Sequence, residues 1–228
     1  MHSPSLAAVL WDMDGTLVDT EPYWMAAETP LVERFGGTWS HEQALGLVGL
    51  GLEESARIFQ NAGVRMGIHE IIDHLTDEVM RQLAVTGVPF RPGAQELLRD
   101  LKANGVKTAL VTMSMRRMAT TVVELIDFPA FDVVIAGDDA TRPKPFPDPY
   151  LQACDLLGVA PADTVAIEDS PNGLRSAVAS GASVIGVPLM VSLTGAGAHT
   201  IWESLEGRTT ADLQAFHTFR IAREGAHA

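Results

Sequence analysis

Apolar residues along this chain follow two rhythms, and the change between them falls near Val88. In residues 21–88 they recur at spacings of three and four, which is the period of an amphipathic helix. The clearest series is Ile71, Ile72, Leu75, Val79 and Leu83. Breaks fall at Gly36, Gly37, Gly63 and Gly67, and Ser40 is placed as an N-cap. The pattern predicts about four helices packed as a compact bundle.

Beyond Val88 short apolar runs alternate with helical segments. The runs contain no alternating polar positions, which is typical of parallel strands buried on both faces. Together with the first run of the chain, they predict strands at residues 7–11, 107–111, 133–136, 164–167 and 183–187. Helices are predicted between them at residues 94–103, 116–126, 150–157 and 174–180. Beyond Pro188 the pattern indicates loops, a short strand and a closing helix.

This alternation predicts an α/β fold, a doubly wound Rossmann-like parallel sheet core with an inserted α-helical cap domain. The core would comprise residues 1–19 and 89–228, and the cap residues 20–88. Because the insert leaves the sheet just after the first strand, it is placed to cover the carboxyl edge of the sheet as a lid.

Polar residues follow the predicted strands at their carboxyl ends, where open α/β sheets bind ligands. Gly15 lets the chain turn sharply after the first of them. In chain order they are Asp12 and Asp14, then Thr112 and Ser114, then Lys144 within a proline-rich loop, then Glu168 and Asp169. If the sheet forms as predicted, Asp169 faces Asp12, and hard oxygen ligands of this kind suit Mg²⁺.

Each of these groups also has a purely structural interpretation. Acidic turns are commonly solvated, and Ser114 would be the N-cap of the helix that follows it. Lys144 would belong to a rigid surface loop, with Asp148 as N-cap and Pro149 at the first helical position. Two considerations favour a site: a helix N-terminus with a hydroxyl binds phosphate, and a lysine fixed among prolines loses less freedom when it holds an anion.

Composition narrows the classes of partner. Lys and Arg total 16 against 29 Asp and Glu in 228 residues, a formal charge of -13, which disfavours nucleic acid and anionic membrane as partners. The single cysteine, Cys154, excludes an internal disulfide and is expected to be a small buried hydrophobe. No signal peptide or membrane span is supported by the pattern, so we expect a cytoplasmic protein.

The four strand-end groups together resemble the haloacid dehalogenase superfamily, in the branch with a helical cap inserted after the first motif. Residues 12–20, DMDGTLVDT, match the first motif, Thr112 the second, Lys144 the third, and Glu168 with Asp169 the fourth. The resemblance covers nearly the whole chain. Four weak motifs in this order make a specific signal.

This resemblance implies a role for each matching residue. Asp12 would be the nucleophile that forms an aspartyl-phosphate, and Asp14 the general acid and base. Thr112 and Lys144 would hold phosphate oxygens. Mg²⁺ would be bound by the Asp12 carboxylate, the Asp14 backbone carbonyl and Asp169, with Glu168 in direct or indirect contact. Substrate contacts are expected from Thr16, Thr112, Met113, Ser114 and Lys144 in the core, and from Trp24 and Leu52 in the cap. Asp19 would be a hinge or N-cap residue.

Within the branch the chain is also similar to β-phosphoglucomutases, whose caps grip a second phosphate with basic residues and histidine. Trp24, Val48 and Leu52 stand here where those mutases carry cations. We therefore expect hydrolysis of a small phosphate monoester, with sugar phosphates as the class implied by the resemblance. A phosphomutase and a non-catalytic binding protein on the same fold remain the alternatives. The expected assembly is a monomer or weak homodimer.

The cap residues expected near the substrate are aromatic and aliphatic. Tyr23, Trp24, Leu50 and Leu52 would line the cap face that meets the substrate. The equally weighted alternative is that the aromatic pair packs inside the cap, since large apolar residues at helical spacing are commonly core residues.

Overall fold

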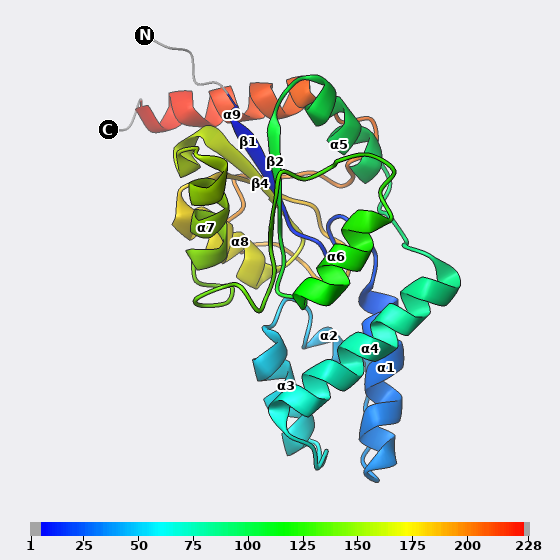
Figure 1. Cartoon of the computed structure of the whole chain (residues 1–228). Helices are drawn as coiled ribbons and strands as arrows, with labels where there is room; N and C mark the ends of the chain where they lie inside the picture. The colour runs from blue at the N-terminus through cyan, green and yellow to red at the C-terminus, as the bar shows by residue number, and fades with distance from the viewer. Residues whose placement is uncertain (1–5, 226–228) are drawn as a thin grey trace.

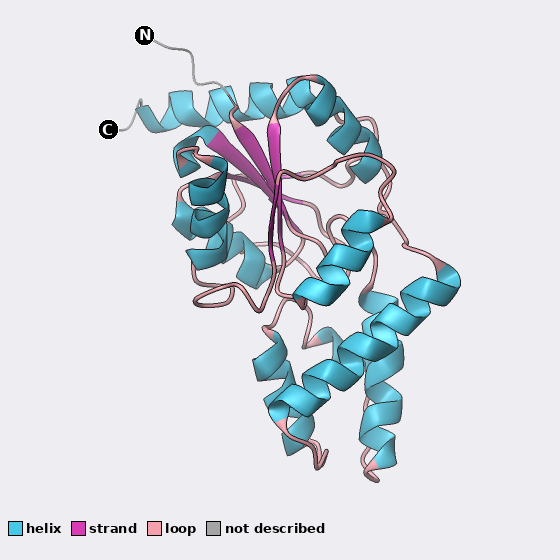
Figure 2. Ribbon diagram, viewed as in Figure 1, coloured by secondary structure: helices cyan, strands magenta, loops and turns pink. Residues whose placement is uncertain are grey.

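The computed structural model describes residues 6–225, and its centre is a six-stranded parallel sheet. The strand order is β3-β2-β1-β4-β5-β6, and Figure 2 shows the strands enclosed by helices. The strands are β1 (Ala8–Trp11), β2 (Lys107–Val111), β3 (Val133–Ile135), β4 (Thr164–Glu168), β5 (Ser183–Gly186) and β6 (Thr200–Ile201). Because β1 lies between β2 and β4, the residues that follow these three strands emerge side by side.

Helices cover both faces of this sheet. They are α5 (Ala94–Ala103), α6 (Arg116–Glu124), α7 (Asp148–Leu157), α8 (Pro171–Ser180) and α9 (Thr210–Gly225), with a short 3-10 helix at Pro161–Asp163. Val9 and Trp11 of β1 pack with α5, α6 and α9, whereas Ala8 and Leu10 pack with α7 and α8. Strands buried in this way on both faces need apolar residues at every position, which is why their runs show no alternation.

The segment after the first strand forms four helices with an apolar cluster of their own. They are α1 (Glu21–Arg34), α2 (His41–Leu45), α3 (Leu52–Asn61) and α4 (Ile68–Thr86). Figure 1 shows them grouped on one side of the α/β part. Leu31, Phe59 and Ile71 are buried between them, and the rings of Trp39 and Phe59 lie 4.8 Å apart between centroids. The expected division at residues 20 and 88 stays a prediction.

Two chain segments connect this bundle to the sheet, and they lie against each other. The backbone N–H of Asp19 donates to the carbonyl of Pro89 at 2.8 Å, and that of Arg91 donates to Leu17 at 3.0 Å. Val18 and Phe90 form an isolated antiparallel bridge. Movement of the bundle would therefore be absorbed close to residues 18–20 and 88–90.

The predicted elements form, with differences at their ends. The short strand expected after Pro188 is β6, and Cys154 is buried as expected. Ser114, Asp148 and Asp19 are not N-caps: the N-caps of α6, α7 and α1 are Met115, Pro147 and Thr20. Each of these three residues forms a hydrogen bond with another part of the chain. Ser114 donates to Asp14, Asp148 accepts from Arg142, and the Asp19 N–H donates to the carbonyl of Pro89, where the chain returns from the bundle.

Within residues 6–225, the structure contains no helix that combines the length and apolar character needed to cross a membrane.

Candidate active site

The site begins where β1 ends, at Asp12 and the turn around Gly15. Gly15 has a φ of 83°, and a Cβ placed on it would lie 1.9 Å from Oδ2 of Asp169. The turn therefore needs glycine for its backbone conformation and for the close approach of a second carboxylate. A Cβ on Gly173 would likewise lie 1.9 Å from Oε2 of Glu168. Two glycines thus make room for the acidic residues at the carboxyl end of β4.

Lys144 is buried at the centre of the site. Its Nζ donates to Oδ1 of Asp12 at 2.6 Å, to Oε1 of Glu168 at 2.6 Å and to the carbonyl of Val111 at 2.9 Å. Burial by itself would lower the lysine pKa, but the charges of Asp12 and Glu168 raise it above its usual range. Tyr150 completes the arrangement, because its hydroxyl donates to the same Glu168 oxygen at 2.7 Å. The ammonium group is therefore fixed in position and remains charged.

Asp12, Glu168 and Asp169 form a buried carboxylate cluster. Each offers an oxygen within 4.8 Å of the others. Oδ2 of Asp12 and Oδ2 of Asp169 are buried and accept no hydrogen bond from the described residues. Burial, followed by the neighbouring carboxylates, raises the pKa of Asp12 and Asp169 above their usual range.

This cluster fits a divalent cation. One ammonium group faces three carboxylates, so negative charge is in excess, and two buried oxygens lack a partner within the described chain. The donors are all hard oxygen atoms, which suits Mg²⁺. Glu168 also fits this cation site, although Lys144 and Tyr150 already donate hydrogen bonds to its Oε1.

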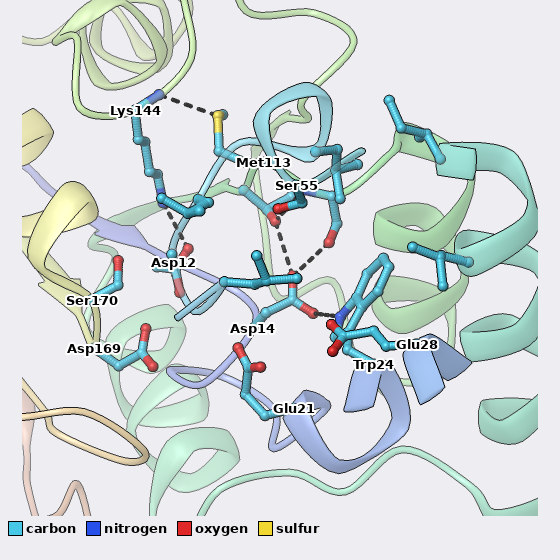
Figure 3. A pocket seen from close by; sticks show the side chains of 18 of the residues that line it. Asp12, Asp14, Glu21, Trp24, Glu28, Ser55, Met113, Lys144, Asp169 and Ser170 are labelled. Atoms are coloured by element: carbon cyan, nitrogen blue, oxygen red, sulfur yellow. Dashed lines mark hydrogen bonds and ion pairs between the residues drawn. The ribbon is translucent and has the colours of Figure 1, made fainter. Parts of the chain in front are cut away.

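Asp14 is held by donors from both parts of the molecule. Its Oδ1 accepts from the Thr20 hydroxyl at 2.5 Å and from the Trp24 indole at 3.2 Å, both next to or on α1. Its Oδ2 accepts from Ser114 at 2.7 Å and from Thr112 at 3.3 Å, which follow β2. Figure 3 shows the Asp14 carboxyl group beside the indole of Trp24. Its orientation therefore depends on how the helical bundle sits over the sheet.

A cavity of about 100 Å³ lies between the bundle and the strand ends. From the core it is lined by Asp12, Asp14, Thr112, Met113, Ser114, Lys144, Asp169 and Ser170. From the bundle it is lined by Glu21, Trp24, Glu28, Leu47, Gly49, Leu50, Leu52, Ser55, Phe59, Ile71, Ile72 and Leu75. Among these lining residues Lys144 is the one with a basic side chain. The cavity has a charged, hydrogen-bonding floor and a largely apolar roof.

Most of the residues expected to contact the substrate line this cavity. Trp24, Leu50, Leu52, Met113 and Ser114 lie at the cavity, together with Asp12, Asp14, Thr112, Lys144 and Asp169. Glu168 is fully buried and is not among the lining residues. Trp24 also packs against apolar clusters of both parts, so both interpretations of it apply.

Two residues lie elsewhere. Thr16 is fully buried in the turn, away from the cavity lining, and its hydroxyl has no partner among the described residues. Tyr23 points to Gly87, whose carbonyl accepts its hydroxyl at 3.4 Å, so the expectation that it lines the cap face is wrong.

Sequence reasoning missed two acids on α1. Burial, together with the charge of Asp14, raises the pKa of Glu21 to about 8, and burial raises that of Glu28 to about 7. Both line the cavity (Figure 3). They stand seven residues apart, which places them on the same side of a helix. That spacing was the available signal.

Tyr150 and Arg91 were also missed, because their roles come from packing. Tyr150 reaches Glu168 from α7. The Arg91 guanidinium donates to the carbonyls of Gly15 at 2.6 Å and Val187 at 3.0 Å, and so fixes the turn after β1 against the end of β5. Tyr150 directly follows the proline-rich loop of Lys144, but neither it nor Arg91 matches a motif in the sequence.

Comparison with known proteins places this arrangement in a family. The model for haloacid dehalogenase-like hydrolases matches residues 9–187, a span that includes all of the carboxylates, hydroxyls and the lysine described above. Protein CbbY of Rhodobacter capsulatus is 34% identical over 194 residues, which are 80% of this chain and 86% of that protein. Hexitol phosphatase A of Escherichia coli K12 is 32% identical over 185 residues, with 78% and 81% covered.

Solved structures agree with the fold over almost the whole chain. The complex of CbbY from Rhodobacter sphaeroides with xylulose-(1,5)bisphosphate has a TM-score of 0.82 at 28% identity, with 92% of this chain and 99% of that one covered. A β-phosphoglucomutase from Clostridium difficile has a TM-score of 0.83 at 21% identity, covers 95% and 99%, and supports the fold alone. The chain belongs to the haloacid dehalogenase-like hydrolases.

Proposed function

We propose that this enzyme is a Mg²⁺-dependent phosphatase that hydrolyses a small phosphate monoester through an aspartyl-phosphate on Asp12. The observation that carries the proposal is the joint position of Lys144, Asp12, Glu168 and Asp169 at the strand ends, with the second acid, Asp14, at the cavity that Asp12 and Asp169 line. Phosphoryl transfer requires positioning and charge neutralisation more than covalent help, and this set provides both. The enzyme is accordingly a phosphoric monoester hydrolase.

Asp12, Asp14 and Lys144 have separate roles in the reaction. An Asp12 oxygen attacks phosphorus while the bond to the leaving oxygen breaks, and Asp14 protonates that oxygen. Asp14 then removes a proton from water, which attacks phosphorus and releases Asp12 and inorganic phosphate. Lys144 orients Asp12 and, with Thr112 and Ser114, neutralises or donates to phosphate oxygens.

Mg²⁺ would be held by Asp12 and Asp169, with Glu168 and the Asp14 backbone carbonyl as the remaining protein groups. When bound, it offsets negative charge between the carboxylates and the phosphoryl group.

The substrate class is proposed from the relatives and the cavity together. One relative is named as a hexitol phosphatase, and a Thermotoga maritima protein, 29% identical over 185 residues, as a phosphorylated carbohydrates phosphatase. These names support a sugar or polyol phosphate. The absence of basic residues other than Lys144 from the cavity lining supports hydrolysis over a mutase reaction, which must hold a second phosphate. A non-catalytic binding protein would have no use for Asp14. Cytoplasmic location and a monomer or weak homodimer stay predictions.

The test is phosphate release from a panel of small phosphate monoesters, with Mg²⁺ and with EDTA. Asp12→Asn should lower kcat at least about a thousandfold, because the nucleophile is lost. Lys144→Met should lower kcat/KM about a hundredfold or more and weaken inhibition by inorganic phosphate. Thermal unfolding establishes that each variant is folded. Near-normal turnover by Asp12→Asn, or a folded wild type that releases no phosphate from any ester, contradicts the proposal.

A further inference from the structure

Glu28 is a buried acid of the bundle that the chemical steps do not use. It lies on α1, is 5% exposed and lines the roof of the cavity. Its Oε2 accepts from the indole N–H of Trp39 at 2.9 Å. Trp39 is itself buried against Phe59, so the carboxyl group is anchored by a rigid donor. A long acidic side chain is thereby held at one place in an apolar surrounding.

The other oxygen of Glu28 is available to a ligand. Within the described chain, no residue donates to its Oε1, although the side chain is buried at the cavity. Figure 3 shows the carboxyl groups of Glu28 and Glu21 directed from α1 toward Asp14. A ligand that enters the cavity displaces water from this carboxyl group, and a ligand group that donates a hydrogen bond to Oε1 offsets the cost of that desolvation.

The bundle residues that line this cavity include no basic side chain. The residues beside Glu28 and Glu21 are apolar, except for the hydroxyl of Ser55 and the indole of Trp24, and the indole already donates to Asp14. Lys144 lies at the floor and is bonded to Asp12 and Glu168. A substrate with a second phosphate or a carboxylate would bury that charge beside two acids.

The electrostatic state of Glu28 agrees with this. Burial raises its pKa to about 7, so its surroundings compensate its own negative charge poorly. A second anion in the roof is therefore opposed most strongly above about pH 8, where both Glu28 and Glu21 are ionised.

We propose that Glu28 is a specificity residue that selects phosphate esters whose phosphate is their sole anionic group and whose leaving alcohol donates hydrogen bonds through hydroxyl or ammonium groups. This inference rests on the proposed function and narrows its substrate class. Glu28 accepts a donor of the leaving group through Oε1, and with Glu21 it rejects esters that carry a second anion.

Matched esters test the selection directly. Glycerol 3-phosphate and 3-phosphoglycerate differ in one alcohol against one carboxylate, and so do glucitol 6-phosphate and 6-phosphogluconate. Within the pair that the enzyme hydrolyses faster, we expect kcat/KM for the ester without a carboxylate to exceed that for the ester with one by at least about tenfold. Glucosamine 6-phosphate shows which kind of donor Glu28 prefers. Faster turnover than that of glucose 6-phosphate indicates an ammonium donor, and slower turnover indicates a hydroxyl donor. Equal rates for both members of each pair overturn the proposal.

A charge-neutral variant assigns the effect to Glu28. Glu28→Gln keeps an oxygen for Trp39 and should reduce the preference within the pair about fivefold or more, mainly by improving the anionic ester. Glu33→Gln removes the same charge from an exposed position of the same helix and should leave the preference unchanged. A folded Glu28→Gln variant with the wild-type preference also overturns the proposal.

Binding separates this inference from the hydrolysis itself. Calorimetric titration of the Asp12→Asn variant with the same pairs measures affinity without turnover. If the esters without a carboxylate bind more tightly but the wild type releases no phosphate, the result supports the selectivity and contradicts the proposed phosphatase activity. Turnover of both members with equal affinity supports the phosphatase and contradicts the selectivity.

Discussion

At the scale of single residues, Trp24 connects the helical bundle to Asp14. Its indole N–H is one of four donors to that carboxyl group. Trp24→Phe keeps the ring and removes the donor, so Asp14 should be less well placed to protonate the leaving oxygen. We expect turnover of an alkyl phosphate to fall about threefold to tenfold, while p-nitrophenyl phosphate, whose leaving group needs little protonation, changes less than about twofold.

The control for this substitution is Tyr23→Phe. It removes a hydroxyl from the neighbouring position of α1, where the group bonds to Gly87 away from the cavity. Both esters should be turned over at the wild-type rate by this variant. An equal loss on the alkyl and aryl esters in Trp24→Phe would show that the indole acts on something other than proton transfer.

Sequence patterns identify residues whose role comes from a strand end. Asp12, Lys144 and Asp169 come together because parallel strands end at one edge, and that edge follows from the apolar runs. Glu28 and Tyr150 differ, since helix packing brings them to the site from positions without a motif. Thr16 shows the converse: it belongs to a motif, yet its side chain is buried away from the cavity.

At the scale of elements, α6 of the core is tied to α4 of the bundle. Arg117 on α6 lies 3.1 Å from Asp73 and 3.2 Å from Asp77 on α4. These groups are well exposed, so each pair contributes about 0.2–1 kcal/mol and is screened by salt. Arg117→Met should lower kcat/KM about twofold to fivefold at low ionic strength, if closure over the cavity precedes transfer.

The dependence of kcat/KM on salt concentration tests whether this ion pair links the bundle to the core. The wild-type kcat/KM should decline toward the variant value as NaCl rises, whereas the Arg117→Met value should stay nearly constant. Arg81→Met is the control, because Arg81 pairs with Glu78 within α4 and does not reach the core. A wild type and an Arg117→Met variant with parallel salt curves would exclude this pair as a link between bundle and core.

Elements were predictable where their own burial determines their composition. β1, β2 and β4 are buried on both faces, so their apolar runs are visible without any partner. The contact between α4 and α6 was not, because Arg117 and Asp73 stand far apart in the chain and meet only after both parts have packed. N-caps failed for a related reason: Ser114 would suit a cap by its residue type, but Asp14 uses its hydroxyl.

At the scale of the whole molecule, buried carboxyl groups link stability to pH. The pKa is raised to about 7 for Asp12 and Glu28 and to about 8 for Glu21 in the folded protein. Between about pH 5 and 8 the folded state keeps protons that the unfolded chain has already released at lower pH, so stability rises as pH falls through this range. His217 opposes this trend below about pH 6.5, because burial lowers its pKa and the unfolded chain takes up the proton.

Metal should reverse this dependence, because it binds the ionised carboxylates. With EDTA, the Tm at about pH 6.5 should exceed that at about pH 8 by about 3 °C or more. Mg²⁺ should raise the Tm more at pH 8 than at pH 6.5, since protons compete with it for Asp12 and Asp169. Asp169→Asn should lose most of the Mg²⁺ effect, whereas Glu28→Gln should keep it and show a flatter EDTA curve. Calorimetric scans of the three proteins decide: a Tm that rises with pH in EDTA would contradict the raised carboxyl pKa values, and an Mg²⁺ effect independent of pH would mean that the acids at the strand ends do not bind the ion.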